Sequence, residues 1–366
     1  MKISDLDKNL KISDGNVPQS AVWLDAKSDV FKLYGVFYDE ENHHFARMPK
    51  SVAANVSKGV EVFSCNTSGG RIRFKTNSRF IGIKAVMENS QLMPHITLAA
   101  QSGFDLFVRD NLGIDRYCST FLPPFGMTKG YSSVYYVKQK YYDSNLSYED
   151  EVLEYTINFP LYDEVKELYI ALDKDALLLN ADGYKGFKPM IFYGSSITHG
   201  GCASRPGNSY PAIISREFNI DFINLGFSGN CLGESVMADY ICGLDMSVFI
   251  CDYDHNAPSV EHLKKTLPAL YTKFRKNKPS TPFIFVSAPD VLLHPEAFNP
   301  RRNVVMETYN NALKNGDENV YFVDGATLFE GENWDLCTVD GCHPNDLGFY
   351  RMAKRISKEI KSALSL

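Results

Sequence analysis

An apolar run that ends in a glycine and two serines lies near the middle of this sequence: Met190-Ile191-Phe192-Tyr193-Gly194-Ser195-Ser196-Ile197-Thr198. A short run of this kind is typical of a buried strand, and the glycine permits a sharp exit from it. The segment predicts a strand that delivers a serine hydroxyl to the rim of a sheet, where a helix begins. Serines in front of helices are commonly N-caps, so this pattern alone leaves a purely structural role open.

Strand and helix patterns alternate around this segment, from about residue 186 to the C-terminus. The predicted strands are 189–193, 221–225, 246–251, 282–287 and 320–323. The predicted helices are 209–218, 260–276, 301–313 and 345–364. Continuous apolar strands alternating with helices predict an α/β domain, in which helices cover both faces of a parallel sheet. Ligand sites of such sheets lie at the carboxyl ends of the strands, where each motif described below falls.

The first half of the chain has a different character. Short runs rich in Val, Ile, Phe and Tyr are separated by frequent turn residues, and they predict strands at 60–65, 71–76, 80–86, 135–137, 153–157 and 168–172. This spacing predicts an all-β sandwich or jelly roll. A chain of 366 residues exceeds one typical core. We therefore expect two domains, 1–185 and 186–366.

A carboxylate and an imidazole stand three residues apart near the C-terminus, in Asp340-Gly341-Cys342-His343. A serine hydroxyl is a weak nucleophile that needs a base, and the base needs an orienting acid. Ser196, His343 and Asp340 supply these three groups. The pattern predicts a nucleophilic serine site, although His343 taken alone also fits an ordinary surface loop.

Two further loops follow predicted strands. The loop Asn224–Asn230 contains Gly229. Because glycine has no side chain, a substrate oxygen can closely approach its backbone N–H. The same loop contains a second candidate nucleophile, Ser228. This serine is flanked by glycines but does not directly follow a strand. A plain strand-to-helix turn explains this loop equally well.

The loop Asp252-Tyr253-Asp254-His255-Asn256 places the Asn256 amide at the same predicted edge. Its two carboxylates and its imidazole suggest a metal site, but the two carboxylates have no third carboxylate partner nearby in the sequence. We therefore expect neither a metal nor a cofactor, and we expect His255 to make local hydrogen bonds.

The bulk composition excludes several classes of partner. The net charge of −6 disfavours nucleic acid and anionic membranes, and no window approaches the length of a membrane span. The first eight residues contain no apolar stretch, and the eight cysteines form no Cys-x-x-Cys pair. These features predict a cytoplasmic protein with reduced thiols. Whether it forms a homo-oligomer is left open by the sequence.

These motifs together resemble those of the SGNH (GDSL-type) hydrolases. Gly194-Ser195-Ser196 resembles the Gly-Asp-Ser block, with serine in place of aspartate. The resemblance implies a flavodoxin-like three-layer fold, Ser196 as nucleophile, and the Asp340/His343 pair as the Asp-x-x-His block. It implies an oxyanion hole formed by Ser196, Gly229 and Asn256, although the third block departs from the family's Gly-x-Asn-Asp. Ser102–Phe107 resembles the Gly-x-Asp-Leu-Tyr segment of β-rich domains that precede some bacterial members.

The resemblance implies a serine esterase for short acyl, above all acetyl, esters on a small molecule or oligosaccharide. We expect three side chains to contact a sugar, namely Tyr193, Arg205 and Tyr253, because aromatic faces stack on pyranose rings. Ordinary packing explains them as well. The alternatives are a thioesterase or lysophospholipase with the same triad, an acyltransferase, and a carbohydrate-binding protein with an inactive hydrolase half.

Overall fold

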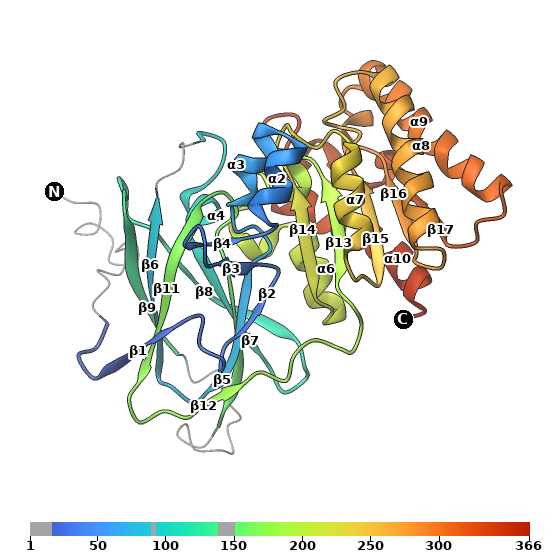
Figure 1. Ribbon diagram of the computed structural model, residues 1–366. Coiled ribbons are helices and arrows are strands. Elements are labelled where there is room, and N and C mark those ends of the chain that lie inside the picture. Colours follow the sequence, from blue (N-terminus) through green and yellow to red (C-terminus); the bar gives the residue numbers. More distant parts are fainter. Residues whose placement is uncertain (1–16, 89–92, 138–150) are drawn as a thin grey trace.

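The computed structural model describes residues 17–88, 93–137 and 151–366. The first eight residues, on which the cytoplasmic prediction partly rests, lie outside the described part. Figure 1 shows a β-rich half joined to an α/β half. The β-rich half ends with β12 (Leu178–Asn180), and the α/β half begins with β13 (Met190–Gly194), so the expected boundary at 185/186 falls in the connection between them.

The β-rich half is a sandwich of two antiparallel sheets, which confirms the predicted class. One sheet has the order β1 (Ala21–Asp25), β11 (Glu164–Asp173), β6 (Phe80–Glu88) and β9 (Gly130–Tyr136). The other has the order β12, β5 (Arg71–Thr76), β10 (Leu153–Asn158), β7 (Phe104–Arg109) and β8 (Asp115–Phe121), with β2 (Lys32–Tyr34) also paired to β5. The strands β3 (Phe37–Asp39) and β4 (His44–Ala46) form a separate ribbon.

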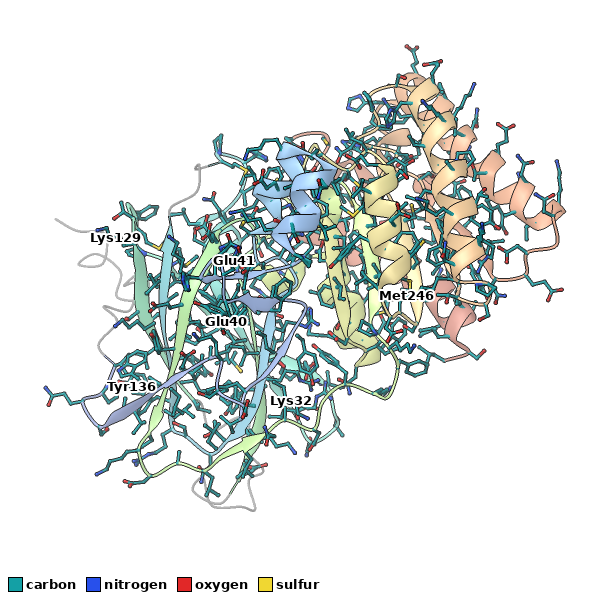
Figure 2. The ribbon with its side chains drawn as sticks, in the orientation of Figure 1. Lys32, Glu40, Glu41, Lys129, Tyr136 and Met246 are labelled. Carbon is teal, nitrogen blue, oxygen red and sulfur yellow. The ribbon has the colours of Figure 1, made fainter. Side chains whose placement is uncertain are left out.

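Alternating side chains fill the space between the two sheets. Ile72 and Phe74 on β5 pack with Ile81 and Ile83 on β6 in one core, and all four are less than 1% exposed. Figure 2 shows side chains filling the gap between the ribbons, while the labelled Tyr136 lies on the outer strand β9 and is exposed. The alternation of apolar and polar residues in the sequence thus accounts for the hydrophobic core between the two sheets.

One predicted strand of this half is wrong. Residues 60–65 belong mostly to a helix, α3 (Lys58–Ser64), which follows α2 (Lys50–Val56). The Ser57 hydroxyl caps α3 by accepting a hydrogen bond from the Val60 N–H. Val60 is fully buried in the core of the α/β half, so a tertiary contact and a cap outweigh the strand-like alternation of this segment. A short third helix, α4 (Leu98–Gln101), precedes β7.

The α/β half is built on a parallel five-stranded sheet, as predicted. The strand order is β14 (Phe222–Gly226), β13, β15 (Val248–Asp252), β16 (Phe283–Val286) and β17 (Val320–Val323). This order, 2-1-3-4-5 in terms of the sheet's own strands, is flavodoxin-like. The predicted strands therefore exist within one or two residues of their expected bounds.

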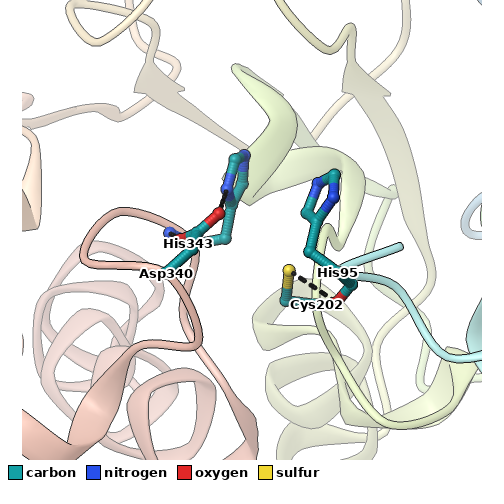
Figure 3. A group of neighbouring side chains, drawn as sticks. All are labelled: His95, Cys202, Asp340 and His343. Carbon is teal, nitrogen blue, oxygen red and sulfur yellow. Dashed lines mark hydrogen bonds and ion pairs between the residues drawn. The ribbon is translucent and has the colours of Figure 1, made fainter. Parts of the chain in front are cut away.

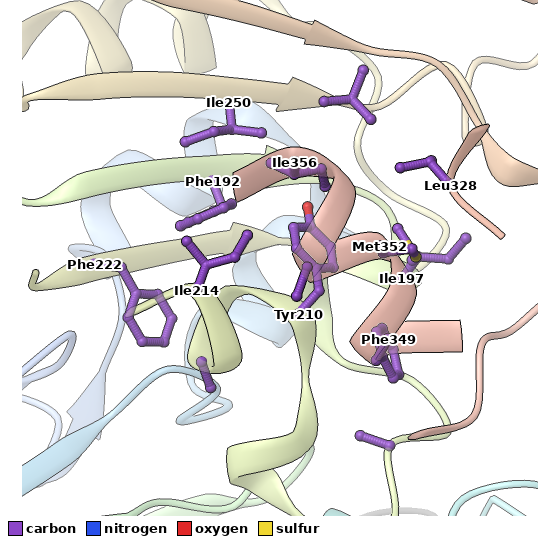
Figure 4. Packing of buried hydrophobic residues seen from close by; sticks show 14 of the residues in the cluster. Phe192, Ile197, Tyr210, Ile214, Phe222, Ile250, Leu328, Phe349, Met352 and Ile356 are labelled. Carbon is purple, nitrogen blue, oxygen red and sulfur yellow. The ribbon is translucent and has the colours of Figure 1, made fainter. Parts of the chain in front are cut away.

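Helices cover both faces of this sheet. On one face, α6 (Tyr210–Phe218) and α10 (Asp346–Leu364) bury Tyr210, Phe349 and Met352 against Phe192 of β13 (Figure 4). The other face is covered by α7 (Ser235–Gly243), α8 (Val260–Asn277) and α9 (Pro295–Lys314). Helix α7 was not predicted, and α9 begins six residues earlier than expected. A very short helix, α5 (Ser196–His199), follows β13 directly.

Buried polar contacts fasten the two halves together. The Arg47 guanidinium, from the β-rich half, donates to the carbonyl oxygens of Asn224 and Gly226 at 3.0 and 2.9 Å. Arg71 on β5 pairs with Asp221 in front of β14. A buried arginine without its acceptors would carry a large desolvation cost. The relative position of the halves is therefore specified by hydrogen bonds as well as by apolar packing.

Membrane insertion through a helix finds no support in the part of the chain that the structure covers. Across residues 17–88, 93–137 and 151–366, no helix combines the length and apolarity that crossing a bilayer requires.

Candidate active site

The turn after β13 explains why this segment carries a glycine followed by two serines. A Cβ on Gly194 would collide with the Thr198 hydroxyl and with the Asp252 carbonyl oxygen of the adjacent strand. Ser195 is the N-cap of α5, and its Oγ accepts a hydrogen bond from the Ile197 N–H at 3.1 Å. The capping role thus falls to Ser195, and the Ser196 hydroxyl has a different partner.

Ser196 meets an imidazole that comes from the other end of the α/β half. The Ser196 Oγ lies 2.9 Å from His343 Nε2, and His343 Nδ1 lies 2.8 Å from Asp340 Oδ2. Because the ionised Asp340 is only an acceptor, Nδ1 carries the proton and Nε2 accepts from the serine hydroxyl. The structure therefore brings the three predicted residues into one hydrogen-bonded line, although 147 positions separate the serine from the histidine.

The loop around Asp340 is ordered by the same carboxylate. Its second oxygen, Oδ1, accepts the backbone N–H groups of His343 and Cys342 at 2.7 and 3.1 Å. Asn345 then caps α10 by accepting the Leu347 and Gly348 N–H groups. One carboxylate thus fixes both the loop and the ring that it carries.

The charges around His343 favour its protonated form. The Cys342 sulfur, against the opposing effect of burial, and the Asp340 carboxylate raise the pKa of His343 to about 9. Burial works against ionisation of Asp340, but its contacts with His343 lower the pKa of this carboxyl below its usual range. An imidazole in this setting can take up a proton from a neighbouring hydroxyl and hold it next to a carboxylate.

The two predicted oxyanion residues lie at the same edge of the sheet as Ser196. Strand register places Gly194 level with Gly226 and with Asp252. Gly229 follows three residues after Gly226; its φ is +67° and open space lies where a Cβ would be. Asn256 follows four residues after Asp252, and its buried Oδ1 has no hydrogen-bond partner among the described residues. The oxyanion roles of Gly229 and Asn256 stay predictions.

The three expected sugar contacts need correction. Tyr193 and Tyr253 are 0% and 1% exposed, because both rings pack in the core beneath the sheet edge. The Arg205 guanidinium pairs with the buried Asp105 at 2.9 Å and lies over the Tyr117 ring. Arg205 therefore joins the two halves through the Gly-x-Asp segment and has little freedom to bind a substrate. Sequence position at a strand end did not distinguish these buried side chains from exposed ones.

His95 from the β-rich half and Cys202 from the α/β half approach the site, and sequence reasoning missed both. The His95 ring centroid lies 5.3 Å from that of His343, and the Cys202 Sγ donates to the His95 carbonyl oxygen at 3.3 Å. Figure 3 shows these side chains together with Asp340. His95 stands alone between loop residues, so no spacing pattern marked it.

A further histidine, His255, contacts the loop between Asp340 and His343. His255 Nδ1 pairs with Asp290 Oδ2 at 3.0 Å, and its Nε2 lies 3.4 Å from the Cys342 sulfur. Against the effect of burial, Asp290 and Cys342 raise the pKa of His255 to about 10. His255 thus makes hydrogen bonds, but the expectation that they would be local was wrong, because Asp290 and Cys342 come from segments distant in the sequence.

Ser228, the other candidate serine, also contacts a histidine. Its Oγ lies 3.2 Å from His199 Nδ1 and 2.9 Å from the Tyr162 hydroxyl. The other ring nitrogen of His199 donates to the Leu161 carbonyl oxygen at 2.7 Å. No carboxylate takes part in these three hydrogen bonds, which separates this pair from the one at Ser196.

Comparison with known proteins agrees with this architecture. Residues 187–361 match the family of GDSL-like lipases and acylhydrolases, and residues 21–178 match the GxDLY family, the N-terminus of SGNH-hydrolase-type esterases. No curated protein sequence matches the chain significantly. A flavodoxin-like sheet with a serine, a histidine and an aspartate at its carboxyl edge, preceded by a β-sandwich, defines the class of SGNH-type esterases and acylhydrolases. The chain belongs to this class, and the family resemblance seen in the sequence is confirmed.

Solved structures with this fold cover nearly the whole chain. A protein described as a GDSL-like lipase from Bacteroides ovatus is 29% identical with a TM-score of 0.81, over 94% of this chain and 98% of the other. The salicylyl-acyltransferase SsfX3 of a tetracycline biosynthetic pathway is 18% identical with a TM-score of 0.74, over 96% and 99%. The acetyl xylan esterase Est2A of Butyrivibrio proteoclasticus is 14% identical with a TM-score of 0.58, over 95% and 99%. The last two similarities concern the fold alone.

Proposed function

We propose that this protein is a serine esterase that hydrolyses short acyl esters, acetyl esters above all, on a carbohydrate. The observation that carries the proposal is the hydrogen-bonded line from Ser196 through His343 to Asp340. Its donor and acceptor order is the one that acyl transfer requires.

The reaction follows from the positions of the protons. The Ser196 Oγ attacks the ester carbonyl carbon while its proton passes to His343 Nε2. Asp340 stabilises the imidazolium and holds its tautomer. His343 then protonates the leaving alcohol, and an acyl-serine remains. Water, deprotonated by the same imidazole, attacks the acyl carbon and releases the acid.

The oxyanion of each tetrahedral intermediate needs donors that are in place beforehand. We assign this role to the N–H groups of Ser196 and Gly229 and to the Asn256 amide, which come from three adjacent strand ends. The exposed, left-handed backbone at residue 229, which favours glycine, and the absence of a Cβ leave room for a substrate oxygen. Such donors contribute most when they point at charge that develops only in the transition state.

A carbohydrate as carrier of the ester has two supports. The first is the similarity in fold to an acetyl xylan esterase. The second is an exposed apolar run just in front of Asp340, formed by Trp334, Leu336 and Val339. An indole on the loop that leads to the site offers a flat apolar face for a pyranose ring. This run replaces the buried tyrosines as the candidate sugar platform.

The test is a comparison of substrates with the full-length protein. We expect release of acetate from acetylated xylan or mannan oligosaccharides, and little hydrolysis of acyl-CoA or lysophospholipid. Trp334→Ala should raise KM for the oligosaccharide while leaving p-nitrophenyl acetate hydrolysis unchanged. Preferred hydrolysis of acyl-CoA or lysolipid would replace the carbohydrate assignment by the thioesterase or lysophospholipase function. Transfer of the acyl group to an added sugar in preference to water would make the protein an acyltransferase.

A further inference from the structure

Four potential metal-binding side chains converge beside the Ser196 hydroxyl, and the esterase reaction uses only two of them. They are His95, Cys202, Asp340 and His343, which we call the four-donor cluster. Their donor atoms all lie within 4.8 Å of one another. Figure 3 shows the two imidazoles side by side, with the Asp340 carboxylate on His343 and the Cys202 sulfur on the His95 backbone.

The chemistry of these donors is specific. Two imidazoles, one thiol and one carboxylate form the donor set that zinc prefers, whereas magnesium and calcium prefer oxygen ligands. Tetrahedral zinc with bonds of about 2.0–2.3 Å separates its ligand atoms by about 3.3–3.8 Å. The side chains therefore need to close by only roughly 1 Å, and Asp340 and His343 lie at exposed and half-exposed positions.

We propose that the four-donor cluster binds zinc and thereby switches the esterase off. The inhibition, though not the binding, rests on the function proposed above. Zinc on His343 Nδ1, next to Asp340, would leave the ring proton on Nε2, which then cannot accept the Ser196 proton. Zinc on Nε2 would occupy the accepting lone pair itself. Either coordination prevents His343 from acting as the base. Because His95 belongs to the β-rich half, this half would contribute a ligand to the inhibitory site.

The second cluster near the loop is a poorer site. His255 presents opposite ring nitrogens to Asp290 and Cys342, at 3.0 and 3.4 Å. The imidazole lies between its two partners. A single ion bound to one ring nitrogen would therefore lie away from the partner at the opposite nitrogen. The four-donor cluster offers four donors, whereas this second cluster offers three.

Proton release should accompany zinc binding, from the Cys202 thiol as well as from the His343 imidazolium. Burial, together with the nearby Asp340 and Cys342, raises the pKa of Cys202 to about 12, so this thiol is protonated near neutral pH. Zinc coordinates the thiolate, and the thiol proton must therefore pass to the buffer. The binding enthalpy should vary with the ionisation enthalpy of the buffer.

The test measures zinc binding by calorimetry on the full-length protein and on Cys202→Ser, with Cys342→Ser as the matched cysteine control. Serine preserves the size of the side chain and its hydrogen bond to the His95 carbonyl. We expect Cys202→Ser and His95→Ala to weaken zinc binding by roughly 100-fold, the upper range for loss of even an outer-shell partner. Cys342→Ser should still bind zinc at least as tightly as wild type, because its lowered His343 pKa leaves less of the competing ring proton to displace. Cadmium should give a thiolate charge-transfer band in wild type that is absent in Cys202→Ser.

The activity arm follows hydrolysis of p-nitrophenyl acetate against zinc and magnesium. Zinc should inhibit wild type at the concentrations at which it binds, Cys202→Ser should resist, and magnesium should have no effect. Binding to the Ser196→Ala variant separates the two proposals, because it should persist even if the esterase function is wrong. The zinc site is refuted if wild type and Cys202→Ser bind equally, if Cys342→Ser alone loses binding, or if wild type binds no zinc.

Discussion

Two serine–histidine pairs lie at the carboxyl edge of the sheet, with nearly equal spacing and opposite chemistry. Ser196 lies 2.9 Å from His343, and Ser228 lies 3.2 Å from His199. The second ring nitrogen of His343 donates to a carboxylate, whereas that of His199 donates to a backbone carbonyl. The partner behind the ring, and not the serine–histidine distance, separates the pairs.

Burial increases this contrast. His199 is 0% exposed, and burial, aided by the nearby Arg47 charge, holds its pKa well below the usual range. The environment of His343 has the opposite effect and favours the imidazolium. A general base must hold a proton during the reaction, and only His343 has compensation for that charge. The Ser228–His199 pair thus has the geometry of a catalytic pair without the electrostatics.

The largest expected effect comes from removing the Ser196 hydroxyl, and removal of the Ser228 hydroxyl is its matched control. Ser196→Ala should lower kcat for p-nitrophenyl acetate by about a million-fold, the loss typical of a serine-hydrolase nucleophile. Ser228→Ala should keep kcat within a few-fold of wild type, because no charge-compensated base serves that serine. Steady-state kinetics on both purified variants, with circular dichroism to confirm folding, checks the pair. Equal losses in the two variants would erase the distinction drawn between them.

The orienting carboxylate comes next. Asp340→Asn preserves the shape of the side chain, but an amide can donate to Nδ1 and so favour the wrong tautomer of His343. We expect kcat to fall by about 10,000-fold, as for the equivalent change in a serine protease triad. Measured kcat values of wild type and variant decide this point. A loss of only a few-fold would mean that the Leu161 carbonyl behind His199 and the Asp340 carboxylate are equivalent partners.

The Asn256 amide should have an intermediate effect. If it stabilises the oxyanion, Asn256→Ala should lower kcat by roughly 100- to 1,000-fold while KM changes little. Separate determination of kcat and KM is the measurement. A raised KM with an unchanged kcat would assign Asn256 to ground-state binding and remove it from the oxyanion hole.

The pH dependence should show the smallest effect. Protonated His343 cannot accept the serine proton, so kcat/KM of wild type should rise with pH and level off above about 9, where the ring is neutral. Cys342 is the foremost cause of the raised pKa, so Cys342→Ser should move this limb to lower pH. A kcat/KM profile over pH 6–10 tests both statements. A limb unmoved by Cys342→Ser would show that Asp340 alone sets the pKa.

Local patterns in the sequence predicted the frame of the site well. The apolar run before Gly194 is one continuous segment, and Asp340 and His343 stand only three residues apart. Both signals are therefore visible in the sequence, and parallel-sheet topology requires these strand and loop ends to meet at one edge. Residues 60–65 were predicted wrongly because their alternation is satisfied by a helix that buries Val60 in the other half. The contributions of His95, Cys202 and Asp290 depend on packing between distant segments, which leaves no spacing signal in one sequence.

Aromatic residues show the same limit. Tyr193 and Tyr253 stand beside functional residues in the sequence, yet they point into the core. Trp334 stands six residues before Asp340 and is exposed. Which face of a strand end or loop an aromatic ring occupies is set by tertiary packing, so adjacency in the chain does not predict a binding role.

Labelling with a fluorophosphonate probe, followed by peptide mass spectrometry, tests the central claim most directly. The probe reacts with a serine only when a neighbouring base activates it. We predict one phosphonylated residue, Ser196, with labelling lost in Ser196→Ala and strongly slowed in Asp340→Asn. An adduct on Ser228, or an unlabelled wild-type protein, would contradict the account.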